Sequence, residues 1–143
     1  MKFIIVQNQQ QLEEAYTIRK KVFVEEQNVP MEEEIDEFEM DAVHFLLYSE
    51  HDQPIAAGRF READGYGKVE RICVLAEQRR TGAGKYIMES IAAYAEQNGI
   101  NKLKLNAQTH AIRFYESLGY EVVSEEFMDA GIPHKTMVKT LKA

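Results

Sequence analysis

Apolar positions in the first third of the chain predict a strand, a helix and an irregular segment, in that order. Residues 3–6 form an apolar run that is typical of a buried strand. Asn8, with Gln11 three residues later, predicts a capped helix that reaches about Val24. Pro30 and the acids after it predict a loop or a short irregular helix, in which apolar residues still recur.

The middle of the chain changes to the alternation that is typical of strands. Three strands are expected, at residues 43–48, 55–61 and 68–75. The turns between them contain Pro54 and Gly67 and are short. Short connections of this kind predict an antiparallel meander.

A helix and further strands are expected in the last third. Apolar residues recur with helical spacing over residues 87–95, and Gly99 stands where a helix C-terminal glycine belongs. The strand expected at 102–106 should run parallel to 68–75, because a helix connects them. A short helix at 111–118 and two strands, at 120–123 and 136–140 around a loop, complete one α/β domain over residues 1–143 with a mixed sheet.

The segment between the meander and the long helix combines glycine with positive charge. Its sequence is Arg79-Arg80-Thr81-Gly82-Ala83-Gly84-Lys85. Glycines allow a phosphate close to the backbone, and the free N–H groups and the dipole of a helix start favour negative charge. Arg79 and Tyr86 do not fit a P-loop, and Ile87 does not fit a dinucleotide fingerprint. We therefore predict a site for the pyrophosphate of another nucleotide-type cofactor, with a basic loop that only caps the helix as the alternative.

Composition narrows the function further. The 143 residues are 45% hydrophobic and 29% charged, as in one globular domain, and the net charge of -7 argues against a nucleic-acid partner. Nine acids lie between Glu25 and Asp41, where they either attract a cationic acceptor or form a solvated face. The lone Cys73 excludes a disulfide framework and indicates a reducing, cytoplasmic setting. We expect no signal peptide, membrane span or metal site, because no apolar run is long enough and the four histidines lack ligand spacing.

Several segments, in the same order, resemble the GNAT superfamily of N-acetyltransferases. The glycine loop is similar to its acyl-CoA-binding loop, and the segment from Asn106 to Gln108 and the Phe-Tyr-x-x-x-Gly-Tyr of residues 114–120 resemble the strand and helix that follow it. Two further segments, residues 19–27 and 129–134, resemble the ElaA-type group of bacterial GNAT proteins and within it the YjcF-like proteins. Gln108 departs from the pattern, since many relatives have asparagine there.

The resemblance implies a fold and a donor site. The fold is a mixed, mostly antiparallel sheet of six to seven strands flanked by helices and splayed between the parallel strands at 68–74 and 102–106. Acetyl-CoA, the implied acetyl donor, would place its pantetheine arm in this gap. The cofactor-binding residues are then the main chain of the β-strand before the loop, the loop itself and one asparagine: Ile72, Cys73, Val74, Arg79, Arg80, Thr81, Gly82, Ala83, Gly84, Lys85 and Asn106.

The same resemblance implies catalytic roles, each with an alternative. Tyr115 matches the general acid of the superfamily, or it packs in the core. Glu70 is a general base that acts through water, or it forms a salt bridge. His134 is the competing base, or it closes the last hairpin. A backbone N–H near Cys73 or Val74 would stabilise the oxyanion, while the Cys73 side chain should be buried on the face opposite Glu70.

The acceptor should bind between residues 23–41 and 129–134. Gln27, Arg71 and His134 are the expected substrate contacts, although Arg71 and Arg59 could equally hold the acidic segment. The resemblance thus implies an N-acetyltransferase in which a small-molecule or protein amine attacks the thioester of acetyl-CoA directly. A homodimer is a further expectation. The alternatives are a non-catalytic acyl-CoA-binding sensor or partner protein and an acyl-homoserine-lactone-type synthase, whose ending differs from this one.

Overall fold

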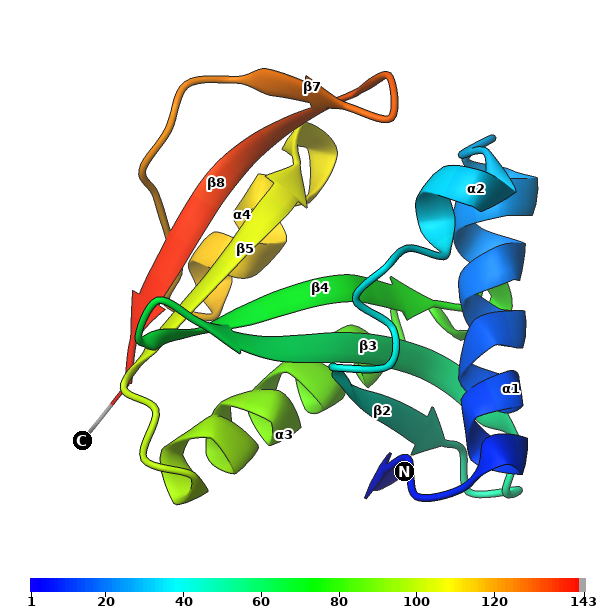
Figure 1. Cartoon of the computed structure of the whole chain (residues 1–143). Helices are drawn as coiled ribbons and strands as arrows, with labels where there is room; N and C mark the ends of the chain where they lie inside the picture. Colours follow the sequence, from blue (N-terminus) through cyan, green and yellow to red (C-terminus); the bar gives the residue numbers. More distant parts are fainter. Residues whose placement is uncertain (142–143) are drawn as a thin grey trace.

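The computed structural model describes residues 1–141, and its eight strands form one mixed sheet in the order β1-β2-β3-β4-β5-β8-β6, with β7 paired to β8 (Figure 1). The strands are β1 (Lys2–Ile5), β2 (Val43–Tyr48), β3 (Pro54–Ala63), β4 (Tyr66–Val74), β5 (Lys102–Gln108), β6 (Glu121–Val122), β7 (Phe127–Asp129) and β8 (Ile132–Thr140). The helices are α1 (Gln9–Arg19), the π-helix η1 (Lys20–Glu26), α2 (Met31–Glu34), η2 (Ala76–Gln78), α3 (Ala83–Gln97), η3 (Thr109–Ala111) and α4 (Ile112–Ser117).

The predicted fold class is confirmed, with local differences. Asn8 caps α1 as expected, since its side chain accepts a hydrogen bond of 2.8 Å from the N–H of Gln11. Beyond Arg19 the predicted helix continues as η1. The sheet gains β7, and β8 begins at Ile132, because Ala130 and Gly131 both have positive φ and form a two-residue hairpin turn.

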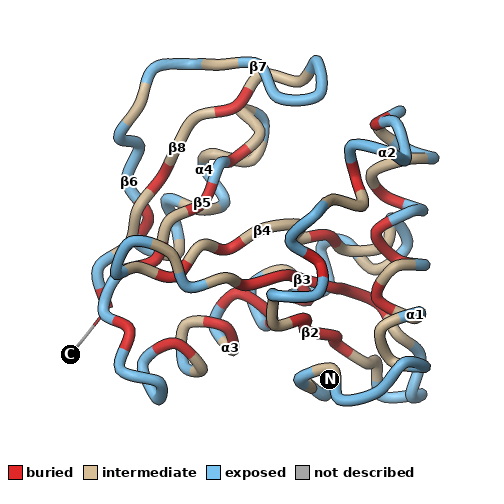
Figure 2. Tube along the Cα trace, viewed as in Figure 1, coloured by how far each residue is buried: buried red, intermediate tan, exposed pale blue. Residues whose placement is uncertain are grey.

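Two apolar clusters bury the two faces of the central strands. On one face α3 packs through Ile87, Met88 and Ile91. On the other face α1 and η1 contribute a second cluster: Ala15, Ile18 and Val22. Figure 2 shows the buried stretches on β2, β3 and β4 between these helices. The helices thus hold the strands that carry the predicted site from both sides.

The sheet is splayed between β4 and β5, as predicted. These parallel strands pair only at Gly67 with Leu103 and at Lys68 with Lys104. Toward their C-terminal ends they diverge, so that β5 and β8 rise away from β4 (Figure 1). The last part of β4 therefore has a hydrogen-bonded neighbour, β3, on one edge only.

A β-bulge interrupts β4 at the edge of this gap. Arg71 has a φ of +56, and the pairing with β3 shifts so that Glu70 lies opposite Arg59 and Cys73 lies opposite Ala57. The prediction that Glu70 and Cys73 occupy opposite faces is therefore wrong, because the bulge adds one residue and both side chains point to the α1 face.

Within residues 1–141, no helix is long and apolar enough to cross a membrane.

Candidate active site

The start of α3 presents backbone amides without helical partners. Gly82 precedes the helix with a φ of +89, and no side chain caps it. The N–H of Tyr86 donates to the Gly82 carbonyl at 2.9 Å, which is the first hydrogen bond of the helix. The N–H groups of residues 83–85 precede it and therefore have no carbonyl partner within the helix. A Cβ built on Gly82 would meet nothing within 4 Å, so the space next to Gly82 at the helix start is open. The geometry suits an anion.

Gly84 brings this helix start against the splayed strands. A Cβ at Gly84 would lie 3.2 Å from the Phe114 ring and 3.9 Å from Val74. A Cβ at this position would be in ordinary contact with Val74 and would require the Phe114 ring to move by a few tenths of an ångström. The predicted pyrophosphate loop is thereby held next to the mouth of the gap.

The charged side chains of the loop differ in their partners. Arg79 donates from Nε to the Val74 carbonyl at 3.1 Å and forms a bidentate ion pair with Glu26 at 2.5 and 2.6 Å. Arg80 and Lys85 are exposed and form no ion pair within the described part of the chain. The structure therefore leaves Arg80 and Lys85 available for a phosphate and gives Arg79 other partners.

Two predicted cofactor-binding residues on the strands beside the gap, Cys73 and Asn106, have side chains with partners or surroundings within the protein. Cys73 is buried, and burial raises the pKa of its thiol to about 12, so that it is no nucleophile at neutral pH. The Asn106 side chain accepts a 2.9 Å hydrogen bond from the Thr136 hydroxyl. Its predicted contact with a cofactor stays a prediction, as do the main-chain contacts of Ile72 and Val74.

Tyr115 lies on α4 with its ring 5.1 Å from Phe114 and 5.9 Å from Tyr120, measured between ring centroids. Burial raises the pKa of Tyr115 to about 12. Its hydroxyl has no hydrogen-bond partner among residues 1–141 and is absent from the fully enclosed polar atoms, which include the Tyr120 hydroxyl. The Tyr115 phenol is thus protonated at neutral pH and free to donate.

Glu70 forms the salt bridges that were the alternative to a role as base. Its carboxylate lies 2.7 Å from Arg61, 3.1 Å from Arg59 and 3.5 Å from Lys68. Burial alone would raise the pKa of Glu70, but the hydrogen bond from Arg61 and the neighbouring positive charges outweigh it and lower the pKa. A carboxylate so stabilised is a poor proton acceptor.

Arg59 and Arg71 hold the acidic segment. Arg71 donates to the Glu33 and Glu34 carbonyls and to the Asp36 carboxylate, each at 3.2 Å. Arg59 is 0% exposed and pairs with Asp36 at 2.7 Å. The structure therefore gives Arg71 the structural role that the sequence left open beside the substrate contact.

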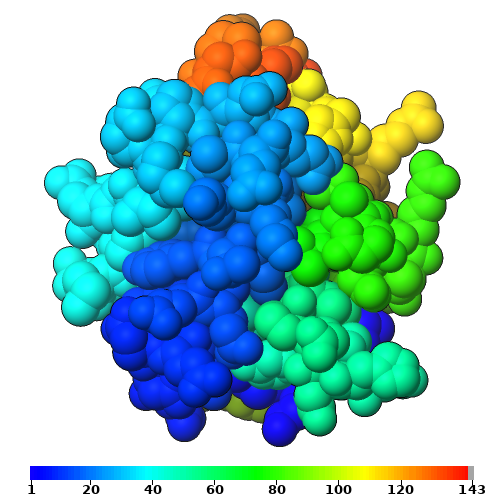
Figure 3. All heavy atoms as spheres, turned by 90° about the vertical axis from the view of Figure 1, so that its right-hand side faces the viewer, coloured from blue at the N-terminus to red at the C-terminus, as the bar shows by residue number. Residues whose placement is uncertain are grey.

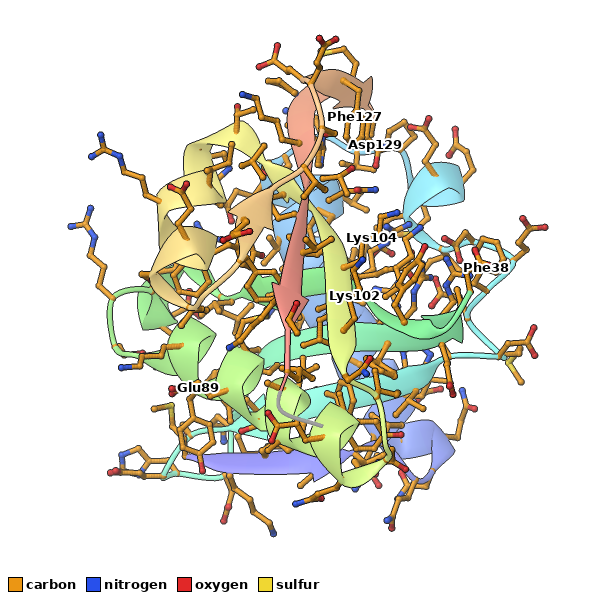
Figure 4. The ribbon with its side chains drawn as sticks, turned by 90° about the vertical axis from the view of Figure 1, so that its left-hand side faces the viewer. Phe38, Glu89, Lys102, Lys104, Phe127 and Asp129 are labelled. Carbon is orange, nitrogen blue, oxygen red and sulfur yellow. The ribbon has the colours of Figure 1, made fainter. Side chains whose placement is uncertain are left out.

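The sequence did not reveal that two acids of this otherwise largely exposed segment, Glu34 and Glu39, are buried. Arg19 is 1% exposed and pairs at 2.7 Å with both Glu34 and Glu39, which belong to a run of acids expected to be solvated or to attract a cation. Phe38 lies at the edge of this charged cluster (Figure 4), with its ring centroid 3.8 Å from the Arg61 guanidinium carbon. These partners are distant in sequence, so no local pattern indicates them.

A second polar group gathers at the end of β5. The Gln27 side chain accepts a 2.8 Å hydrogen bond from Gln108, whose own carbonyl lies 2.7 Å from His110 Nε2. His134 lies opposite Gln108 in the β5–β8 register. Two predicted acceptor residues, Gln27 and His134, are thus brought to one place together with Gln108, which the sequence had marked only as a departure from the family.

His134 is fixed in one orientation. Its Nδ1 lies 2.7 Å from the Ile132 carbonyl, and its ring stacks on Phe127 at 6.0 Å. Because a carbonyl only accepts, Nδ1 carries the proton in the neutral ring, and Nε2 keeps its lone pair.

Within residues 1–141, no three His, Cys, Asp or Glu side chains are grouped so as to hold a metal ion.

Comparison with known proteins gives the family. Residues 5–141 match the acetyltransferase (GNAT) domain. The chain belongs to the GNAT acetyltransferases. It is 51% identical to the uncharacterised N-acetyltransferase YjcF of Bacillus subtilis (strain 168) over 97% of this chain and 99% of that one.

Solved structures agree with this assignment. Escherichia coli ElaA superposes with a TM-score of 0.87 at 25% identity, over 97% of this chain and 99% of that one. An aminoglycoside 6'-N-acetyltransferase, solved with coenzyme A, superposes with a TM-score of 0.79 over 100% and 98% of the two chains, at an identity of 14% that shows the fold alone. The protein is an acetyltransferase, and the predicted ElaA-type and YjcF-like relationship is confirmed.

Proposed function

We propose that this GNAT protein transfers the acetyl group of acetyl-CoA to an amine by direct attack. The observation that carries the proposal is the open amide start of α3, held against strands that separate beyond Lys68. A structural neighbour solved with coenzyme A supports a CoA ligand for this fold. The amine belongs to a small molecule or to a protein.

The residues around the gap fit such a donor. The pyrophosphate would be held by the backbone and by the two exposed cations of the loop: Arg80, Thr81, Gly82, Ala83, Gly84 and Lys85. The unpaired edge of β4 offers the main chain of Ile72 and Val74 to the amides of the pantetheine arm. Bound acetyl-CoA supplies the acetyl group as an activated thioester.

The same edge of β4 would stabilise charge on the carbonyl oxygen. A backbone N–H of Cys73 or Val74 that faces the gap has no β5 partner. It is fixed before the reaction by the β3 pairing and the bulge at Arg71, so it needs no reorganisation.

Tyr115 would act on the leaving sulfur. A phenol with a pKa of about 12 keeps its proton throughout the neutral range. Complete transfer of that proton to a thiolate of ordinary pKa, about 8.5, would cost roughly 5 kcal/mol. We therefore assign Tyr115 a strong hydrogen bond to the developing thiolate. The Tyr115 proton passes fully to the sulfur only as the attacking amine loses its own proton.

His134 is the base that the geometry supports. Its Nε2 lone pair is free because Nδ1 is committed to Ile132, whereas the Glu70 carboxylate is committed to Arg59, Arg61 and Lys68. The pairing of His134 with Gln108, whose side chain bonds to Gln27, supports this role near the proposed acceptor site.

The lone, buried Cys73 supports action in a reducing compartment, the cytoplasm. The proposed reaction does not depend on this location, on a homodimer or on the single-domain organisation of residues 1–143. Each of these three stays a prediction.

Thiol release from acetyl-CoA tests the proposal. We would assay spermidine, glucosamine and a lysine-containing peptide between pH 6 and pH 9 (roughly the range around a thiol pKa of 8.5). At least one amine should release thiol faster than water does. His134→Asn keeps a donor for Ile132 but lacks the second ring nitrogen, so it should lower kcat about 100-fold. Glu70→Gln should change the pH profile little. Thiol release that no amine accelerates, or a fully active His134→Asn, would contradict the proposal.

A further inference from the structure

Two consecutive residues at the end of η1 contact the two arms of the splayed sheet. Glu26 pairs with Arg79 through both carboxylate oxygens, at 2.5 and 2.6 Å. Arg79 in turn donates to the carbonyl of Val74, the last residue of β4, at 3.1 Å. The Glu26 side chain is thus tied to the end of β4.

The next residue is tied to the other arm. Gln27 accepts a 2.8 Å hydrogen bond from the side chain of Gln108, the last residue of β5. His110 lies 2.7 Å from the other end of the same amide and limits its rotation. Figure 3 shows this face, where the lighter blue atoms near residues 20–30 adjoin both the green atoms near residue 80 and the yellow atoms near residue 110.

The backbone at Gln27 and Asn28 departs from an ordinary helix end. The N–H of Gln27 bonds to the Val22 carbonyl five residues earlier, which is the π-helical spacing, and Asn28 then turns the chain with a φ of +60. A π-turn changes the direction of the side chains that follow it and is frequent at functional sites.

The end of β4 is not paired to the end of β5, although each is paired to another strand, β3 and β8 respectively. Their pairing stops at Lys68 and Lys104, and both strands continue without partners in the gap between them. On this face, the contacts of Glu26 and Gln27 span the opening from one strand end to the other.

We propose that Glu26 and Gln27 form a cross-bar that fixes the separation between the ends of β4 and β5. Its catalytic meaning rests on the proposed function, because Val74 lies on the donor side of the gap and Gln108 and His134 lie on the acceptor side. Both are positioning residues, since they act through Arg79 and Gln108 and need not touch the reacting atoms. A misplacement of about 1 Å between reacting groups lowers a rate by roughly 100-fold.

The separation can be measured without donor or acceptor. Spin labels on Glu77→Cys, beside the end of β4, and on Arg113→Cys, on α4 after β5, report the distance between the arms, and both positions are exposed. The native Cys73 is buried with a thiol pKa of about 12 and stays unlabelled. Pulsed electron-spin distance measurements would compare the native cross-bar with Glu26→Ala/Gln27→Ala. The matched control is Glu25→Ala/Glu32→Ala, which removes two exposed side chains of the same region.

The cross-bar variant should give a displaced and broader distance distribution, while the control gives the native one. Thermal unfolding should confirm that both remain folded, because the variant removes one exposed ion pair and one side-chain hydrogen bond. An unchanged distribution in the cross-bar variant, or an equal change in the control, would overturn the proposal even if acetyl transfer is established. For an amine that the native enzyme acetylates, kcat of the cross-bar variant should fall about 10- to 100-fold with acetyl-CoA affinity retained; an unchanged kcat overturns the catalytic part.

Discussion

Two phenols lie ring to ring at the end of α4, and their surroundings assign them different roles. Tyr115 and Tyr120 are 5.9 Å apart between ring centroids, and burial raises the pKa of both. The Tyr120 hydroxyl is fully enclosed and has no hydrogen-bond partner within residues 1–141. The Tyr115 hydroxyl is not enclosed in this way, which agrees with the role as donor proposed for it.

Removal of each hydroxyl should therefore have a different effect. Tyr115→Phe should lower kcat about 100-fold and leave acetyl-CoA affinity within about 2-fold, because the bond is made to charge that develops during the reaction. Tyr120→Phe, the matched control, should retain kcat and gain about 1 kcal/mol of unfolding free energy, because an unpaired buried hydroxyl is lost. Full turnover of Tyr115→Phe by steady-state kinetics would remove Tyr115 from the mechanism.

For single residues, the sequence predicted which side chains belong to the candidate site better than it predicted their contacts and protonation. Tyr115, Gln27 and His134 could be picked out because they occupy motif positions. The state of Glu70 could not be predicted, because it depends on Arg59 and Arg61 across a strand pair and on a bulge at a non-glycine residue. An arginine whose backbone has a positive φ, such as Arg71, cannot be recognised from the local sequence.

Among the elements, the segment around α2 depends on buried charge rather than on apolar packing. Arg59 lies beneath it with 0% exposure and contacts Asp36, Glu39 and Glu70. Burial alone would raise the pKa of each of these three acids, but the hydrogen bonds and charges of arginine outweigh it, so that all three pKa values are lowered. Each acid contributes stability above its unfolded pKa, near 4, that is lost as the pH falls through its lower folded value.

Arg59→Met tests this arrangement. The variant keeps an apolar stem but leaves three buried or half-buried carboxylates without their shared partner, so it should lose about 3–5 kcal/mol of unfolding free energy. Arg113→Met, which changes an exposed arginine of α4, should lose less than about 0.5 kcal/mol. Equal losses in the two variants by urea denaturation would show that the buried network does not hold the segment.

The elements themselves followed from periodicity, apart from those that tertiary contacts create. The meander, α3 and β5 were predicted because their apolar spacing is long and regular. The three residues of β7 alternate too briefly to be recognised, and they pair only because the turn at Ala130 and Gly131 folds them onto β8. The ion pairs of the α2 segment join residues such as Arg19 and Glu34, which are 15 positions apart.

In the whole molecule, the candidate donor residues and the candidate acceptor residues lie on two arms of one sheet, which separate beyond the paired starts of β4 and β5. One arm carries the glycine loop and the bulged end of β4, and the other carries the Gln108 and His134 side chains. Figure 1 shows β5, β8 and β7 rising from the level of β3 and β4, with α2 across the opening. We expect the first arm to bind the donor and the second arm to orient the acceptor.

The most direct test of this account is a calorimetric titration with acetyl-CoA of the native protein and two glycine variants. Gly82→Glu adds a negative charge in the open space at the start of α3, next to the proposed pyrophosphate site, and should weaken binding at least about 100-fold, roughly 2.7 kcal/mol. Gly65→Glu is the matched control, because Gly65 has a similar φ of +83 and nothing within 4 Å of an added Cβ, but lies in the β3–β4 turn. We expect native affinity for Gly65→Glu and loss of affinity for Gly82→Glu alone. Native affinity in Gly82→Glu would contradict the assignment of the donor site.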